Sequence, residues 1–150
     1  MKKCFAQFSK RNFLKVLAPL TFAAVAMLLS GCDTIHGVER PVPMTTSPDT
    51  EAIKQSLQTV KVDYFNSIRA GSVTVFSLRR GVADVSVRYD SEAKPKNRLI
   101  LYSITHKTAP SPAVLAADRV LLDETYATLH RDIPGLPSHI SEYEVNLSRR

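Results

Sequence analysis

Three side chains near the C-terminal end of the chain have residue types and a spacing that suit metal binding. His130, Asp132 and His139 flank one short segment rich in proline and glycine, so the fold could bring them together. A protein metal site usually takes three or four such ligands. A histidine at the end of a helix is also favoured by the helix dipole alone. This simpler explanation accounts for His130, and we therefore predict no metal site.

Motifs typical of enzyme active sites are absent from the sequence. It contains no G-x-S-x-G, H-E-x-x-H or C-x-x-C pattern and no glycine-rich phosphate loop. The glycines after position 31 stand in a predicted tether or at predicted turns, at positions 37, 71, 81 and 135. We therefore predict no catalytic residues and no cofactor, and we expect a protein that is not an enzyme.

The two cysteines, Cys4 and Cys32, both lie in the N-terminal part of the chain. Cys32 follows an apolar stretch of 14 residues, Val16–Leu29, which itself follows five lysine and arginine residues. A helix that crosses a bilayer needs roughly 20 apolar residues. The shorter stretch behind a basic start is typical of a secretory signal that is removed.

The pentapeptide Leu28-Leu29-Ser30-Gly31-Cys32 resembles the lipobox of bacterial lipoprotein precursors. The resemblance implies cleavage between Gly31 and Cys32 and attachment of lipid to the sulfur of Cys32. The next residue, Asp33, resembles the inner-membrane retention signal of enteric bacteria. The expected location is therefore the periplasmic side of the cell membrane, with the inner membrane favoured and the outer membrane left open. No family is recognised for residues 34–150.

The route of export stays open between two systems. The segment S-K-R-N-F-L-K at residues 9–15 resembles the twin-arginine signal, which is read by a receptor, but Lys10 replaces the first arginine. An ordinary basic start for the general secretory route explains the same residues.

Removal of the signal changes the charge of the protein. The whole chain has 20 Lys and Arg residues against 14 Asp and Glu residues, a net charge of +6. Five of the basic residues and none of the acidic ones precede Cys32, which leaves +1 for the rest. Global basicity therefore gives no argument for nucleic-acid binding, and we expect no nucleic-acid partner.

Basic residues nevertheless gather at two predicted turns. They are candidates for contact with an anionic surface, and the simpler alternative is solvated charges that protect the ends of strands. These residues are Arg79, Arg80, Lys94, Lys96 and Arg98.

The chain is predicted to have three regions: a signal peptide at 1–31, a lipidated tether at 32–47 and a single α/β domain at 48–150. Pro41 and Pro43 favour extended backbone, and the segment lacks apolar periodicity. In the domain, apolar residues at positions 53, 57, 60, 64 and 68 predict a helix over 48–70, with a strand at Val60–Phe65 as its competitor. A second helix is predicted over 112–131.

Strands are predicted at 72–79, 82–89, 98–105 and 139–148 from β-branched and alternating residues. In the last strand, Tyr143, Val145 and Leu147 are expected to face inward, and Glu142, Glu144 and Asn146 outward. The expected fold class is α+β, a two-layer sandwich of order α-β-β-β-α-β with a four-stranded sheet and two helices on one face. The last strand could lie parallel to an earlier one.

These features predict a lipid-anchored protein that faces the periplasm. It would be a non-catalytic component of a membrane-spanning assembly for secretion, conjugation or transport. Its partners would be the membrane, through the N-terminal lipid, and other envelope proteins. The alternative is a binder of anionic lipid, glycan or metal at the envelope surface.

Overall fold

The computed structural model describes residues 34–106 and 108–148, and Thr34 to Ser148 form one unit. The predicted signal peptide and the residues Gly31, Cys32 and Asp33 lie outside this part of the chain. Within the described residues, no helix is long and apolar enough to cross a membrane.

The domain is built on one six-stranded sheet in which every neighbouring pair of strands is antiparallel. Its spatial order is β2-β3-β4-β5-β1-β6. The strands are β1 (Thr34–Val42), β2 (Tyr64–Ala70), β3 (Val73–Arg80), β4 (Ala83–Asp90), β5 (Leu99–His106) and β6 (Tyr143–Ser148). Two helices, α2 (Thr50–Gln58) and α3 (Pro112–Asp132), and a short 3₁₀ turn, η1 (Pro95–Asn97), complete the described fold.

The predicted four-stranded sheet of order α-β-β-β-α-β is wrong, although the fold is α+β. Residues 34–42, which we expected in a tether, form β1 between β5 and β6. The inward side of β1 alternates as Val38, Arg40 and Val42, so a charged residue interrupts the apolar pattern. Pro41 is tolerated because β6 pairs with β1 only as far as Glu39, which leaves β5 as the one neighbour there.

The predicted helix over 48–70 is also wrong in its second half. Helix α2 ends at Gln58, and β2 begins at Tyr64. Ile53, Leu57 and Val60 are buried as the helical stripe requires, but Tyr64 and Ile68 are 47% and 65% exposed. A two-residue turn at Gly71-Ser72 then joins β2 to β3. The aromatic and β-branched residues after position 60 favoured this strand locally, and pairing with β3 stabilises it.

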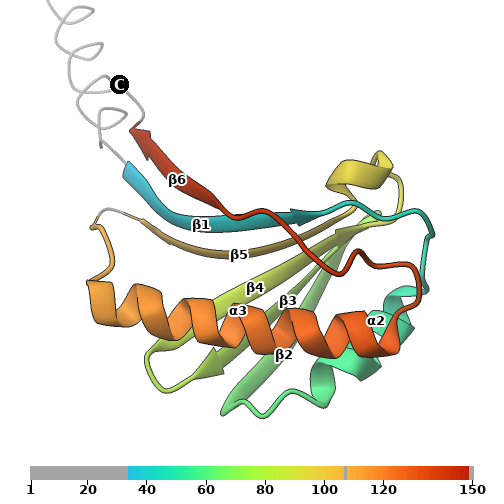
Figure 1. Cartoon of the computed structure of the whole chain (residues 1–150), viewed down its shortest axis with the longest axis horizontal. Coiled ribbons are helices and arrows are strands. Elements are labelled where there is room, and N and C mark those ends of the chain that lie inside the picture. Colours follow the sequence, from blue (N-terminus) through green and yellow to red (C-terminus); the bar gives the residue numbers. More distant parts are fainter. Residues whose placement is uncertain (1–33, 107, 149–150) are drawn as a thin grey trace, which may run out of the picture. The chain divides into compact units, whose positions relative to one another are not determined.

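The hydrophobic core lies between one face of the sheet and the helices, and Figure 1 shows α3 running along that face with α2 beside its C-terminal end. Ala83, Val85, Val87 and Tyr89 of β4 are buried there, as their alternation predicted. Leu121, Leu122 and Leu129 of α3 close the core from the other side. Both helices thus lie on the same face of the six-stranded sheet.

The other predicted elements match closely, except for the last strand. Helix α3 begins as expected, with Ser111 as its N-cap and Pro112 in its first turn. Strand β6 is antiparallel to β1, so the parallel arrangement that we considered is wrong. Its predicted facing is reversed as well. Tyr143 is 57% exposed, whereas the adjacent Glu142 is half-buried on the helix side, where arginines neutralise it.

Candidate functional site

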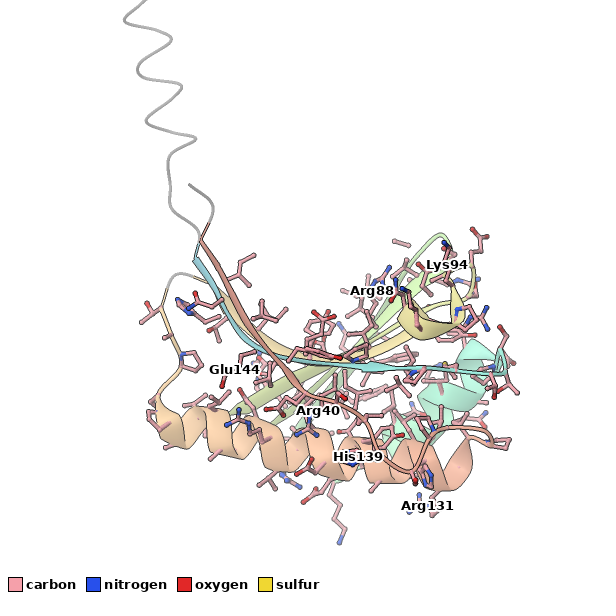
Figure 2. The ribbon with its side chains drawn as sticks, turned by 45° about the horizontal axis from the view of Figure 1, so that its top comes forward. Arg40, Arg88, Lys94, Arg131, His139 and Glu144 are labelled. Carbon is pink, nitrogen blue, oxygen red and sulfur yellow. The ribbon has the colours of Figure 1, made fainter. Side chains whose placement is uncertain are left out.

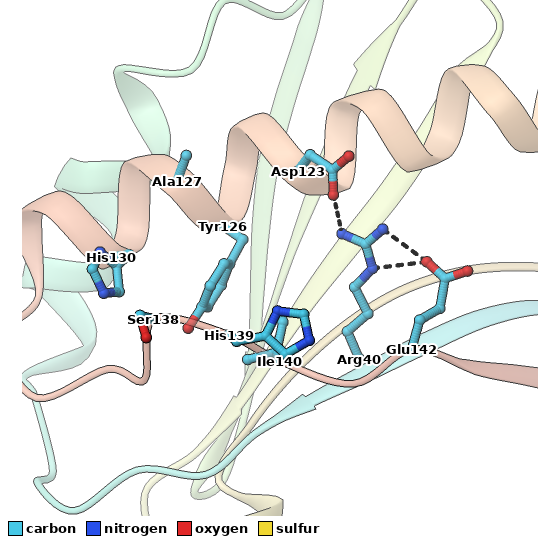
Figure 3. Close-up of a pocket in the computed structure, with 9 residues that line it drawn as sticks. All are labelled: Arg40, Asp123, Tyr126, Ala127, His130, Ser138, His139, Ile140 and Glu142. Carbon is cyan, nitrogen blue, oxygen red and sulfur yellow. Dashed lines mark hydrogen bonds and ion pairs between the residues drawn. The ribbon is translucent and has the colours of Figure 1, made fainter.

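A hollow of about 470 Å³ lies between α3, β1 and the segment that leads into β6 (Figure 3). Arg40 enters it from β1, Asp123 and Tyr126 from α3, and Glu142 from the C-terminal segment. The Tyr126 hydroxyl donates a hydrogen bond to the Pro137 carbonyl, which fixes this segment against the helix. The other lining residues are Ala127, His130, Ser138, His139 and Ile140.

Arg40 connects the three elements around this hollow. Arg40 is only 9% exposed, and each of its three guanidinium nitrogens contacts a carboxylate oxygen. Nη1 lies 2.5 Å from Oδ1 of Asp123, and Nη2 lies 2.7 Å from Oε2 of Glu142. A buried charge is tolerated in a protein when it is paired in this way. Arg40 thereby ties β1 to α3 and to the start of β6.

Arg119 of α3 extends the network, with Nε 2.7 Å from Oε1 of Glu142. Burial alone would raise the pKa of Glu142, but hydrogen bonds from Arg40 and Arg119 hold it below its ordinary value. Burial likewise opposes the charge of Arg40, and its bonds to Asp123 and Glu142 raise its pKa above the ordinary value. The charges of the network therefore neutralise one another, and the network joins β1, α3 and the segment that leads into β6.

The three residues considered as metal ligands are only partly brought together. His130 and His139 are exposed and line the same hollow (Figure 3). Asp132 is not among its lining residues. The Asp132 carboxylate instead accepts hydrogen bonds from Ser56 of α2, at 2.9 Å, and from Arg131. Among the described residues, no group of three or more His, Cys, Asp or Glu side chains is placed to hold a metal ion.

The basic residues proposed for an anionic surface fall into two groups at opposite ends of β4. Arg79 and Arg80 end β3 and precede β4, whereas Lys94, Lys96 and Arg98 follow β4 around η1. The first group is paired within the domain: Arg79 lies 2.7 Å from Asp84, and Arg80 lies 2.5 Å from Glu124. The two groups do not make one patch.

The second group is itself mixed. Arg98 donates hydrogen bonds to the carbonyls of Thr46 and Ala93, so its guanidinium joins the loop that contains η1 to the loop between β1 and α2. Lys94 and Lys96 are exposed, and within the described residues neither forms an ion pair. These two lysines are the part of the predicted set that remains available to an anionic partner.

The sheet face opposite the helices is the largest feature that sequence reasoning missed. In the described chain both helices lie on one face, and Figure 2 shows Arg40 on the helix side and Arg88 on the opposite side. The strand registers place apolar side chains of β2, β3, β5 and β6 on this uncovered face. They are Ile68, Val73, Val75, Ile100, Tyr102, Ile104, Tyr143 and Val145.

Polar and charged side chains of β4 divide the uncovered face, because Asp84, Ser86, Arg88 and Asp90 all lie on it, between the apolar residues of β3 and those of β5. Arg88 of β4 is paired with Asp90, with 3.0 Å between Nη2 and Oδ2. Glu39 of β1 lies beside Tyr102 and Tyr143 in one row across the strands. A signal for this face was present in the sequence, because the strand at 98–105 is apolar on both sides. The covered and uncovered sides of that strand could not be told apart without the position of α3.

Comparison with protein-family models, with curated proteins and with solved structures finds no match to this chain.

Proposed function

We propose that this protein is a lipid-anchored envelope protein that faces the periplasm and acts as a non-catalytic component of a membrane-spanning assembly. The part of the uncovered sheet face formed by β5, β1 and β6, with apolar side chains of β5 and β6 on either side of β1, is the observation that carries the proposal. Larger apolar patches on a soluble domain typically mark a surface that binds another protein. Partner binding through this face explains why apolar residues are kept on a side that the helices leave open.

The proposed anchor adds a geometric argument. Thr34 is the first residue of β1, only two positions after Cys32. Two extended residues span at most about 7 Å. A lipid on Cys32 would therefore hold the sheet at the bilayer surface, without the long spacer that we predicted from residues 32–47. A domain held this close is suited to contact a membrane-embedded partner.

The anchor is tested by metabolic labelling with palmitate. We expect the wild-type chain to incorporate label and to begin at Cys32, as shown by mass spectrometry of the purified protein. Cys32→Ala should lose the label, while the matched Cys4→Ala variant should keep it. A wild-type protein with an unmodified Cys32 thiol, or one that begins at Met1, would refute the anchored location.

The partner surface is tested by mild detergent extraction and co-purification at native expression. The double variant Ile100→Ser and Tyr102→Ser changes the uncovered face, and Val120→Ser changes an exposed apolar residue on α3 as a control. We expect one stoichiometric membrane protein to co-purify with the wild type and with the control, and to be lost from the double variant.

A charge-driven binder would give a different pattern. Lys94→Glu with Lys96→Glu would then abolish binding to anionic vesicles in a salt-dependent way, and the uncovered-face variant would bind normally. That outcome, or recovery of the wild-type chain without any partner, would contradict the proposal.

A further inference from the structure

Strand β2 is an open edge of the sheet. Its seven residues pair only with β3 in the described chain, and every residue of β2 except Phe65 is exposed. The free edge of a strand presents unpaired N–H and C=O groups, and proteins usually protect it with charges, prolines or bulges. β2 has no proline, and Arg69, near its end, is its only charged residue. The free N–H and C=O groups of β2 can therefore pair with another strand.

The residues of β2 are arranged so that the strand complements itself. Asp63 precedes the strand, and its carboxylate accepts a hydrogen bond from the Gly81 N–H at 2.7 Å, which fixes its position. Arg69 lies near the other end, and Asn66 lies midway between the two. Tyr64 and Ile68 are exposed apolar residues on either side of Asn66.

We propose that β2 pairs antiparallel with β2 of a second copy of this chain, with Asn66 opposite Asn66. This register sets Arg69 of each copy opposite Asp63 of the other, and Tyr64 opposite Ile68. Each contact occurs twice because the interface is symmetric. Opposite-charge pairs and aromatic–aliphatic pairs are those that stabilise neighbouring antiparallel strands. A register centred on Ser67 would instead place Arg69 opposite Phe65 and leave both charges without a partner.

The other edge of the sheet is less suited to self-pairing. β6 carries Glu144, which is exposed, and Glu142 directly precedes the strand. A register centred on Glu144 would set the two Glu144 residues opposite each other, which is unfavourable between neighbouring strands. Pairing through β2 avoids this repulsion, because Asp63 and Arg69 have opposite signs.

The proposed pair has a defined shape. The two-fold axis of an antiparallel edge pair runs perpendicular to the sheet, so the helices of both copies lie on the same side of one continuous sheet. The pairing does not require the proposed lipid anchor, although confinement to one membrane would raise the effective concentration of the copies. Failure of palmitate labelling would therefore leave this inference intact.

The test is disulfide crosslinking of the full chain in an unfractionated cell lysate, which contains the chain whether or not it is anchored to the membrane. Residues directly opposite each other on antiparallel strands have Cα atoms about 4.5–5.5 Å apart, which is within the range that a disulfide spans. We expect Asn66→Cys to give a covalent dimer on mild oxidation, seen on a non-reducing gel. Wild type should give none under the same conditions, which controls for the native cysteines.

Three further variants make the result decisive. Ser67→Cys places the thiols of the two copies out of reach in the proposed register, so it should give no dimer. Arg69→Glu, added to Asn66→Cys, opposes two carboxylates and should cause loss of the crosslinked band, whereas Arg88→Glu should leave the band unchanged. Absence of a dimer for Asn66→Cys, or a dimer for Ser67→Cys in its place, would overturn the proposal.

Discussion

Asp118 shows how one buried side chain fixes a helix to the sheet. It lies on α3 and is 1% exposed. One carboxylate oxygen accepts from the Asp84 N–H at 2.9 Å, and the other accepts from the Ser103 hydroxyl at 2.5 Å. A single residue thereby joins α3 to both β4 and β5. Buried polar groups of this kind contribute mainly by what their loss leaves unpaired.

We predict that Asp118→Ala destabilises the domain by about 2–4 kcal/mol, because it leaves the Asp84 N–H and the Ser103 hydroxyl without acceptors. The free energy of unfolding, measured with urea, tests this. Glu92→Ala, on an exposed turn, is the control and should cost almost nothing. Equal stability of the two variants would show that Asp118 does not anchor the helix.

Gly37 is a second position where the structure constrains the residue type. Its φ is 154°, and a Cβ placed there would lie 1.9 Å from the carbonyl oxygen of Ser103. Because that atom belongs to the backbone of β5, it cannot move aside without disturbing the sheet. We predict that Gly37→Ala costs about 3 kcal/mol or more.

The matched control is Gly71→Ala, where φ is 61° but a Cβ would meet nothing within 4 Å. It should cost about 1 kcal/mol from backbone strain alone. Thermal unfolding of both variants provides the comparison. If Gly37→Ala unfolds at the same temperature as Gly71→Ala, then the close approach of β1 to β5 is not a constraint.

At the scale of elements, prediction from sequence depended on whether a segment had a regular pattern of its own. β4 alternates cleanly, and α3 has a cap, a proline and a broad apolar side, so both were found. β1 was missed because Gly37, Arg40 and Pro41 resemble a tether. Their places in the sheet depend on partners far along the chain: Ser103, Glu142 and Ile100. No local rule could supply those contacts, and the Arg40 network was missed for the same reason.

The Arg40 network makes the attachment of the C-terminal segment sensitive to acid. The pKa of Glu142 is lowered from its ordinary value of 4.5, which means that the folded state favours its charged form. Its stabilising contribution is therefore complete above about pH 4.5 and is lost as the pH falls through the lowered folded value. Protonation of Glu142 would remove its ion pairs with Arg40 and Arg119, whereas Arg40 would keep its ion pair with Asp123.

We predict that Glu142→Gln lowers the unfolding free energy at pH 7 and loses less stability than wild type when the pH falls below about 4.5. Urea unfolding between pH 7 and pH 3 measures the difference. Subtracting the two curves removes the shared contributions of Asp90, Glu124 and Asp132, whose pKa values are also lowered. Parallel curves over this range would show that Glu142 does not contribute to the acid response.

At the scale of the whole molecule, the sheet has two faces with different roles. Leu101 and Ile100 are neighbours on β5, but Leu101 is fully buried under the helices and Ile100 lies on the uncovered face. The buried core therefore lies on the helix-covered side of the sheet. The other side is free to serve binding, and the two roles can be separated by substitution of adjacent residues.

We predict that Leu101→Ala costs about 2–5 kcal/mol of unfolding free energy, as expected for a large buried side chain. Ile100→Ala should cost much less in the isolated protein, because its side chain is only partly shielded from water. Co-purification of a partner from membranes should show the opposite pattern. Ile100→Ala should weaken co-purification, whereas any Leu101→Ala chain that remains folded should still bind the partner. Equal losses of stability at both positions would mean that the uncovered face belongs to the core, and the proposed function would lose its main support.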